Sequence, residues 1–279
     1  MQPLQVLIKL LTQNSNVHIC IHDVSGMMKN PLLHLDFKYM IHSGDFCNCA
    51  KNTEKGLKLC MTCKMIANKK AMSVKKDFCG YCPNGLYEIC VPVCIDGEVK
   101  SIIYIGNLTF DRHFTEKSVK KICKITQCDE RPVIKNIRNT ELIKSSLPYF
   151  QMAEIIKEYI LLCVQRAPEK KEKSYHWAVE NIKGYAETYY RNELSLKQLA
   201  NLYFINEKYI GRLFKKQIGC SFREYLNRIR IEKAAELLIN TDMKVIDIAY
   251  ETGFGNVTYF NRVFASQRGC TPVEYRRSR

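Results

Sequence analysis

The chain has 279 residues, of which 46% are hydrophobic, and this is enough for two domains that each bury a core. Lysine and arginine number 43 against 28 aspartate and glutamate, so the net charge of +15 favours a polyanionic partner, either nucleic acid or an acidic membrane surface. No segment approaches the roughly 18 apolar residues of a membrane span, and residues 1–11 lack a signal-peptide pattern, so we expect a cytoplasmic protein with no membrane partner.

The N-terminal half is predicted to be mixed α+β. Residues 17–21 alternate and are rich in β-branched side chains, as in a strand. Residues 56–72 have the spacing of a helix. Asp96-Gly97 separates two β-rich runs, 88–95 and 99–108. This dipeptide is a strong hairpin signal, because glycine tolerates the positive φ of a tight turn.

Cysteines are concentrated between positions 47 and 94, and in a cytosolic protein they are expected to be thiols or metal ligands rather than disulfides. One CxC pair and two CxxC pairs each let two thiolates close on one ion, and four soft ligands suit zinc or an iron–sulfur cluster. The candidate metal ligands are Cys47, Cys49, Cys60, Cys63, Cys79 and Cys82. Two alternatives stay open: a reversible disulfide switch, or reduced thiols that line a pocket or core.

The other cysteines and the nearby histidines have plainer interpretations. Cys90 and Cys94 lie at even spacing in a β run, so both are expected to point to one face, most simply the core. Cys20 is typical of a small buried residue. His22 and His42 lie near the cysteine cluster, but a lone histidine is more often a surface or core residue than a ligand.

Residues 148–166 carry apolar side chains every three or four positions, which predicts an amphipathic helix. Two interpretations of its apolar stripe are open: packing against its own domain, or dimerisation. Residues 167–173 follow. They are charged and contain Pro168, which indicates an interdomain linker.

Seven helices are predicted after the linker. Ser195 and Ser221 open two of them, each followed three residues later by Gln or Glu in a capping-box pattern. Thr271 opens the last helix, with proline at the first helical position, where no amide is needed. Gly219 and Gly269 are expected to end the helices before them.

The helical half contains an internal repeat. Residues 209–225 recur at 259–275, with an Arg, a Phe, a Gly-Cys pair and a Glu-Tyr pair in the same places. Residues 199–200 match 248–249 at an offset one shorter, so the second turn has one extra residue. Two copies of one helical unit on a basic chain indicate two DNA-reading helices, because the second helix of a helix-turn-helix lies in the major groove.

Each copy leaves polar and basic side chains on the face opposite its apolar residues. Arginine suits guanine through bidentate bonds worth about 1–3 kcal/mol of discrimination, and threonine and asparagine can donate or accept. The candidate DNA-binding residues are Asn206, Lys208, Tyr209, Arg212, Lys215, Lys216, Asn256, Thr258, Tyr259, Asn261, Arg262 and Arg276.

Residues 200–275 resemble the DNA-binding domain of the AraC/XylS family of transcription regulators. The likeness is carried by 209–216 (YIGRLFKK), 259–264 (YFNRVF) and 269–276 (GCTPVEYR). It implies one all-α domain in which a long helix joins two helix-turn-helix units. It also implies that the two reading helices enter successive major grooves on one face of the DNA.

The chain departs from this family within the reading helices. The family usually has two lysines, which contact phosphates, where this chain has Ala265 and Ser266. Lys215 and Lys216 of the first copy are therefore expected to supply more of the affinity for the DNA backbone. Gly211 presents no side chain, so the first helix is expected to read fewer bases than usual.

Residues 5–125 resemble the PocR sensory domain, a PAS-like ligand-binding module often joined to AraC-type DNA-binding domains. The likeness is carried by Phe46-Cys47, by Cys60, and by residues 82–86 (CPNGL) and 105–107 (IGN). It implies that the domain senses a small organic molecule, in some members a diol or another hydrocarbon derivative. Directly after Cys82, this chain has Pro83 where the family usually has histidine.

We therefore predict an α+β, PAS-like sensor domain over 1–128, a connecting helix and charged linker over 129–174, and an all-α DNA-binding domain with two helix-turn-helix units over 175–279. The predicted function is a transcription regulator, an activator, that binds double-stranded promoter DNA as a homodimer under the control of a small-molecule, metal or redox signal. RNA polymerase is a further candidate partner. The alternatives are a cysteine-centred cytosolic enzyme with an accessory nucleic-acid-binding domain, and a DNA-architectural protein. No phosphate loop or catalytic triad supports an enzyme, so no catalytic residue is predicted.

Overall fold

The chain divides into two compact units, Met1–Trp177 and Ala178–Arg279, in a computed structural model that describes residues 2–166 and 176–277. The predicted linker, residues 167–173, lies outside the described residues. None of the helices in the described ranges is long and apolar enough to span a bilayer.

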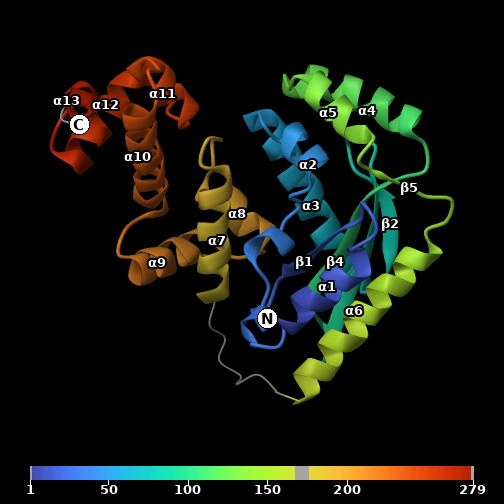
Figure 1. The fold of residues 1–279 in the computed structure, drawn as a ribbon. Coiled ribbons are helices and arrows are strands. Elements are labelled where there is room, and N and C mark those ends of the chain that lie inside the picture. The colour runs from blue at the N-terminus through green and yellow to red at the C-terminus, as the bar shows by residue number, and fades with distance from the viewer. Residues whose placement is uncertain (1, 167–175, 278–279) are drawn as a thin grey trace. The chain divides into compact units, whose positions relative to one another are not determined.

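The first unit is built around a largely antiparallel sheet (Figure 1). Its strands run in the order β1 (His18–Asp23), β4 (Glu98–Thr109), β3 (Tyr87–Ile95) and β2 (Phe78–Tyr81). The short β5 (Glu141–Leu142) pairs in parallel with the end of β4. The three predicted strands and the mixed α/β class of this half are confirmed.

The β3–β4 hairpin turns at the predicted dipeptide. Asp96 has a φ of 51° and Gly97 a φ of 75°, the positive values that a two-residue type I′ turn requires. Further along the hairpin, the register shifts at Glu88, and β4 accommodates the shift at Asn107, whose φ is 62°. Such a bulge re-aims side chains, and the Glu88 carboxylate lies directly over the bare backbone of Gly106.

One face of the sheet is covered by α1 (Pro3–Thr12) and α6 (Leu147–Arg166) (Figure 1). In the main core of this unit, α6 buries Ala153, Ile156, Ile160 and Cys163 against apolar side chains of β1, β3 and β4. Burial of each isoleucine contributes about 2 kcal/mol. The predicted apolar stripe therefore packs on its own domain, one of the two interpretations left open.

The opposite face of the sheet meets α3 (Glu54–Val74), which includes the helix predicted over 56–72. Cys20, Tyr104 and Cys90 form a row across β1, β4 and β3 on this face. Cys90 and Cys94 contribute to the same cluster, as their even spacing predicted. Cys20 is fully buried, as also predicted.

Three further helices pack around a smaller core. They are α2 (Asp45–Ala50), α4 (Arg112–Thr126) and α5 (Glu130–Ile137), with Phe46, Val119 and Val133 between them. Two 3₁₀ turns, Met27–Lys29 and Phe37–Tyr39, lie between β1 and α2. This core holds α2 in place beside the site described below.

The second unit is helical throughout its regular structure. Its helices are α7 (His176–Tyr189), α8 (Leu196–Leu202), α9 (Glu207–Ile218), α10 (Phe222–Asn240), α11 (Val245–Glu251), α12 (Val257–Arg268) and α13 (Pro272–Arg277). The prediction of seven helices is confirmed within the residues the structure describes.

Local signals set the helix ends where the sequence predicted them. Ser195 and Ser221 form complete capping boxes with the residue three positions later. The hydroxyl of Thr271 accepts from the amide three residues on at the start of α13. Gly219 and Gly269 end α9 and α12 with φ values of 82° and 75°, the left-handed conformation that glycine adopts without strain.

The two copies of the repeat share their packing. The ring of Phe214 lies edge-on to Tyr225 with centroids 5.6 Å apart. Fifty residues later, Phe264 lies edge-on to Tyr275 at 5.4 Å. The sequence repeat therefore encodes the same contact twice.

The turns between the paired helices also correspond. The first turn spans residues 203–206 and the second 252–256, so the predicted extra residue is present. Both turns contain a left-handed residue, Phe204 with φ 55° and Gly253 with φ 88°. The left-handed position is therefore occupied by a phenylalanine in the first turn and by a glycine in the second.

Candidate functional site

A pocket in the first unit is lined by residues of α2, α3 and the segment between β2 and β3. Its empty volume, including the solvent at its mouth, is about 420 Å³. Four of the six cysteines predicted as metal ligands line it, namely Cys47, Cys60, Cys63 and Cys82. The polar lining residues are His42, Lys51, Lys64, Asn84 and Glu88.

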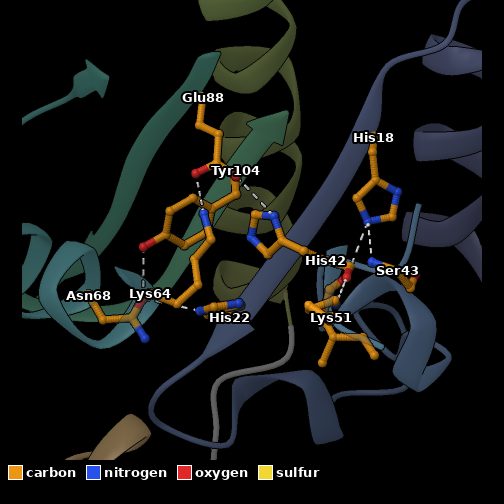
Figure 2. Close-up of polar contacts among 10 residues, drawn as sticks. His18, His22, His42, Ser43, Lys51, Lys64, Asn68, Glu88 and Tyr104 are labelled. Atoms are coloured by element: carbon orange, nitrogen blue, oxygen red, sulfur yellow. Dashed lines mark hydrogen bonds and ion pairs between the residues drawn. The ribbon is translucent and has the colours of Figure 1, made fainter. Parts of the chain in front are cut away.

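A buried polar network lies at one wall of this pocket (Figure 2). Glu88 is at its centre, since its Oε1 is 3.0 Å from Nδ1 of His42 and its Oε2 forms an ion pair with the Lys64 ammonium. The same ammonium lies 4.4 Å from the centroid of the Tyr104 ring. Side chains from α3, β3, β4 and the segment before α2 therefore converge here.

Asn68 of α3 extends the network. Its Oδ1 lies 3.1 Å from Nδ1 of His22 and accepts a 2.8 Å hydrogen bond from the Tyr104 hydroxyl. The rings of His22 and His42 have centroids 5.7 Å apart. Among the described residues, Nε2 of each ring is buried and has no hydrogen-bond partner.

Burial and local charge fix the protonation states in this network. Burial lowers the pKa of His22 to about 4 and that of His42 well below its usual value, and the Lys64 ammonium lowers both further. Burial alone raises the pKa of Glu88, but Lys64 and His42 outweigh it and hold the pKa below its usual range. At neutral pH, Glu88 is therefore ionised and His42 donates to it as a neutral ring.

Three of the thiols that line the pocket are held in the protonated form by burial. Burial raises the pKa of Cys47 to about 12 and that of Cys63 to about 11, and it raises the pKa of Cys82 well above its usual value. The thiolate is the nucleophilic and redox-active form of cysteine. This environment therefore disfavours both a disulfide switch and a cysteine nucleophile at these three positions.

The structure does not gather the six predicted metal ligands. Cys79 lies exposed on β2, and Cys49 faces α5, where its sulfur accepts a 3.4 Å contact from Asn136. Over the part of the chain that is described, no three of the six sulfurs lie within 4.8 Å of one another. In this geometry the six sulfurs are not gathered around one point, and four of them line the pocket.

The α9 helix presents most of the residues predicted to contact DNA in the first copy. Asn206 caps it by accepting from the Tyr209 amide at 3.1 Å. Ile210 and Phe214 are fully buried and so orient the opposite face outward. The exposed predicted residues of this helix are Lys208, Tyr209, Arg212, Lys215 and Lys216.

The α12 helix repeats this arrangement with different chemistry. Asn256 caps it by accepting from the Tyr259 amide at 2.9 Å. Thr258, Asn261 and Arg262 are exposed. The Arg262 guanidinium lies 5.3 Å from the centroid of the Tyr259 ring, and this stacking restricts its rotamers.

Two predicted DNA contacts are engaged within the domain. The Tyr259 hydroxyl accepts a 2.7 Å hydrogen bond from Asn227 of α10. The Arg276 guanidinium donates to the carbonyl oxygens of Leu238 at 3.2 Å and Met243 at 2.6 Å. These contacts give both side chains a role in holding α10, α12 and α13 together, which the sequence did not indicate.

The residues of the buried network were not predicted to form a site. Lys64 and Asn68 lie in a helix that was predicted from its spacing alone, and nothing in the neighbouring sequence indicates that these two side chains are buried. One signal was available: His18, Cys20 and His22 alternate on one face of a strand whose other face carries isoleucines. Such a polar row inside a core strand marks a site.

A pocket in an α/β unit, followed by a helical unit with two repeated, partly basic helix pairs, is the arrangement expected of a protein that couples a sensory domain to a nucleic-acid-binding domain. A model of the sensory domain found in PocR matches residues 1–162, and a model of a helix-turn-helix domain matches residues 199–278. The chain belongs to the PocR sensory-domain family, with an AraC-type helix-turn-helix domain at its C-terminal end.

Named relatives are regulators. The regulatory protein PocR of Salmonella typhimurium is 23% identical over 212 residues, which cover 70% of this chain and 69% of that protein. The uncharacterized HTH-type transcriptional regulator YijO of Escherichia coli is 37% identical over 98 residues, so the match spans about a third of each chain (35%). The solved C-terminal domain of AraT, a response regulator from Geobacillus stearothermophilus, is 33% identical with a TM-score of 0.36, covering 37% of this chain and 85% of that one.

Proposed function

We propose that this protein is a sequence-specific DNA-binding transcription regulator, an activator, whose N-terminal domain binds a small molecule and thereby changes how the C-terminal helices engage promoter DNA. A ligand that binds one arrangement of the protein better than another shifts the balance between them. In this proposal the sensory domain has a PAS-like fold, and residues 175–279 form the DNA-binding domain. The PocR family match supports the first part, and the AraC-type match supports the second.

The observation that carries the proposal is the repeated helix pair. In α8–α9 and α11–α12, a short helix, a tight turn with one left-handed residue and an Asn-capped second helix recur with the same buried aromatic contacts. We infer that both pairs are helix-turn-helix units and that α9 and α12 enter the major groove.

The two helices differ in chemistry, and we infer different duties. Lys215 and Lys216 end α9 with exposed ammonium groups, which suit phosphates. Arg262 of α12 is exposed and held by the Tyr259 ring, so its planar donors are pre-oriented for a guanine edge. In this scheme α9 supplies more of the backbone affinity and α12 more of the base selectivity.

The pocket is the proposed effector site. Its charged groups are already engaged, because Lys64 pairs with Glu88 and Lys51 donates to the His42 carbonyl. Asn84 is different, since its buried Oδ1 has no hydrogen-bond partner among the described residues. An uncharged organic molecule with a hydroxyl group, such as a short diol, would supply that donor.

Dimerisation is proposed through the outer face of α6. Leu147, Ile155 and Leu162 are more than half exposed there, whereas the other face of the helix is buried in its own core. A bound dimer would place four reading helices on DNA and leave a surface for RNA polymerase. Light scattering of the full chain tests this, and Leu162→Asp is expected to shift a dimer to a monomer.

The DNA-binding proposal is tested by selecting operator sequences with the full chain and titrating the selected duplex. Arg262→Ala is expected to cost about 1–3 kcal/mol on the selected sequence and little on random DNA. Lys215→Ala is expected to weaken both alike and to lower the salt slope by about 1. Lys233→Ala, whose ammonium is paired with Glu236, is the control. Equal loss on both duplexes for Arg262→Ala would contradict the assignment.

The effector proposal is tested by thermal shift with a panel of short diols and alcohols. Binding is expected to stabilise the wild-type chain, to weaken in Asn84→Leu, and to be blocked by Leu59→Trp, which fills the pocket. A panel member that stabilises all three proteins equally would be acting elsewhere.

A further inference from the structure

We propose that Cys20, His22 and His42 form a binding site for a divalent transition-metal ion that favours sulfur and imidazole ligands, with Zn²⁺ as the probe. All three residues are buried, and one donor atom from each lies within 4.8 Å of the other two. It is the one trio of His, Cys, Asp or Glu side chains to meet this condition across residues 2–166 and 176–277. It is separate from the six cysteines that the sequence singled out.

The hydrogen bonds of the two rings determine which ring nitrogen is left to bind an ion. Nδ1 of His42 is 3.0 Å from a Glu88 carboxylate oxygen, and Nδ1 of His22 is 3.1 Å from Asn68 Oδ1. The Glu88 carboxylate is ion-paired with the Lys64 ammonium and therefore accepts, and Asn68 Oδ1 is an amide oxygen and also accepts, so each Nδ1 carries the proton. The lone pair of each ring therefore sits on Nε2.

These two Nε2 atoms are free to bind an ion. Both are buried, and neither has a hydrogen-bond partner in the described part of the chain. Metal-bound histidines almost always donate their other N–H to a carboxylate or a carbonyl oxygen. The pair Glu88 and Asn68 supplies that outer support before any ion is bound, and Asn68 is itself held by the Tyr104 hydroxyl.

The fold positions the donors on two segments. Cys20 and His22 lie two residues apart on β1, so both point to the face that meets α3, while His42 comes from the segment before α2. Zinc bonds of about 2.0–2.3 Å in a tetrahedron place ligands about 3.5 Å apart, so donors that lie within 4.8 Å of one another need to move by about 1 Å at most. Three protein ligands leave a fourth position open, and His42 also lines the pocket.

The charge at this position is compensated. The nearest cation, Lys64, is already neutralised by its ion pair with Glu88. On binding, the Cys20 thiol forms a bond to the ion and releases its proton to solvent, so the thiolate offsets one of the two charges. Affinity is therefore expected to rise with pH.

The test uses the full chain, reduced, stripped with chelator and titrated with Co²⁺, followed by displacement with Zn²⁺. One equivalent is expected, with a thiolate-to-cobalt charge-transfer band. Cys20→Ser is expected to abolish the band, and His22→Gln and His42→Gln to weaken binding at least tenfold. Asn68→Ala, which removes only the outer support, is expected to weaken it by about 10–100-fold.

Matched controls separate this site from its rivals. Cys90→Ser changes a buried thiol in the same row of the sheet and is expected to bind normally. The double variant Cys60→Ser/Cys63→Ser is expected to do so too. Loss of binding in that double variant, with retention in Cys20→Ser, would overturn the proposal.

X-ray absorption of the Zn²⁺-loaded wild-type chain gives a readout that does not depend on any variant folding. One sulfur at about 2.3 Å with nitrogen ligands at about 2.0–2.1 Å is expected. Four sulfurs, or no stoichiometric zinc at all, would refute the assignment. Neither result depends on whether the chain binds DNA.

Discussion

Replacing Glu88 by leucine is the most informative perturbation of the sensory domain. The carboxylate accepts from His42 and is ion-paired with Lys64, and the two charged side chains are only 15% and 6% exposed. Leucine has similar bulk but leaves the Lys64 ammonium buried without its counter-ion. Breaking a buried pair in this way typically costs about 3–5 kcal/mol, a large share of the roughly 5–15 kcal/mol that stabilises a domain.

The double variant Glu88→Leu/Lys64→Met isolates the cause. With both charges removed, no ion is stranded, and replacement of a buried pair by apolar residues is often neutral or stabilising. We therefore expect the double variant to recover most of the stability lost in Glu88→Leu.

Hydrogen exchange of peptides from β1, β3 and β4 measures the opening of this unit separately from the helical one. Two results would refute the reasoning. One is a loss below about 1 kcal/mol in Glu88→Leu. The other is a double variant at least as unstable as the single one.

Three further predictions follow from single contacts. Because His22 has a folded-state pKa of about 4 against 6.5 when unfolded, the unfolded state binds more protons between these values. His22 alone should therefore lower the metal-free stability by up to about 3 kcal/mol as pH drops from 7 to 4, in addition to the fall that His42 causes, and the total fall should be smaller in His22→Phe. Arg276→Ala removes two hydrogen bonds to main-chain carbonyls and should destabilise the helical unit by about 1–3 kcal/mol in urea titrations, with no change in base preference. Gly253→Ala should lower the stability of the helical unit by more than about 1 kcal/mol, because the added Cβ would lie 2.7 Å from a backbone oxygen and φ is 88° there. Phe204→Gly should leave the stability nearly unchanged, because glycine adopts the positive φ of this position without strain. Thermal unfolding of the two variants measures both effects.

The helical half was predictable because its signals are local. Capping boxes at Ser195 and Ser221, the glycines that end α9 and α12, and the repeat itself each act within a few residues of chain. The roles of Tyr259 and Arg276 were not predictable in this way. Their hydrogen-bond partners lie more than thirty residues away in the sequence, on α10 or just after it. The sequence around Arg276 does not indicate that its guanidinium donates to main-chain carbonyl oxygens.

In the sensory half, too, the locally encoded features were predictable and the long-range contacts were not. Asp96-Gly97 fixed the hairpin, and the even spacing of Cys90 and Cys94 fixed their face. The site depends instead on Lys64, which a helix brings to Glu88 from 24 residues away. The CxxC spacing was visible in the sequence, but it did not show that the two cysteines of a pair lie apart. Cys79 is exposed on β2, whereas Cys82 lines the pocket.

Three cysteines of the pocket therefore act as small, polarisable apolar groups and not as reactive thiols. Burial keeps Cys47, Cys63 and Cys82 protonated, so each behaves as a small apolar group with a weak donor. Such a wall accommodates the hydrocarbon body of an uncharged effector, while Asn84 offers a single fixed acceptor at one end. Soft walls with one polar anchor select for hydrogen-bonding groups more than for shape, because leaving a buried acceptor unpaired costs more than a small gap in apolar packing. An effector that lacks the hydroxyl would leave the Asn84 oxygen without a hydrogen bond. The pocket is therefore expected to discriminate between a diol and its parent hydrocarbon more strongly than between diols of neighbouring length.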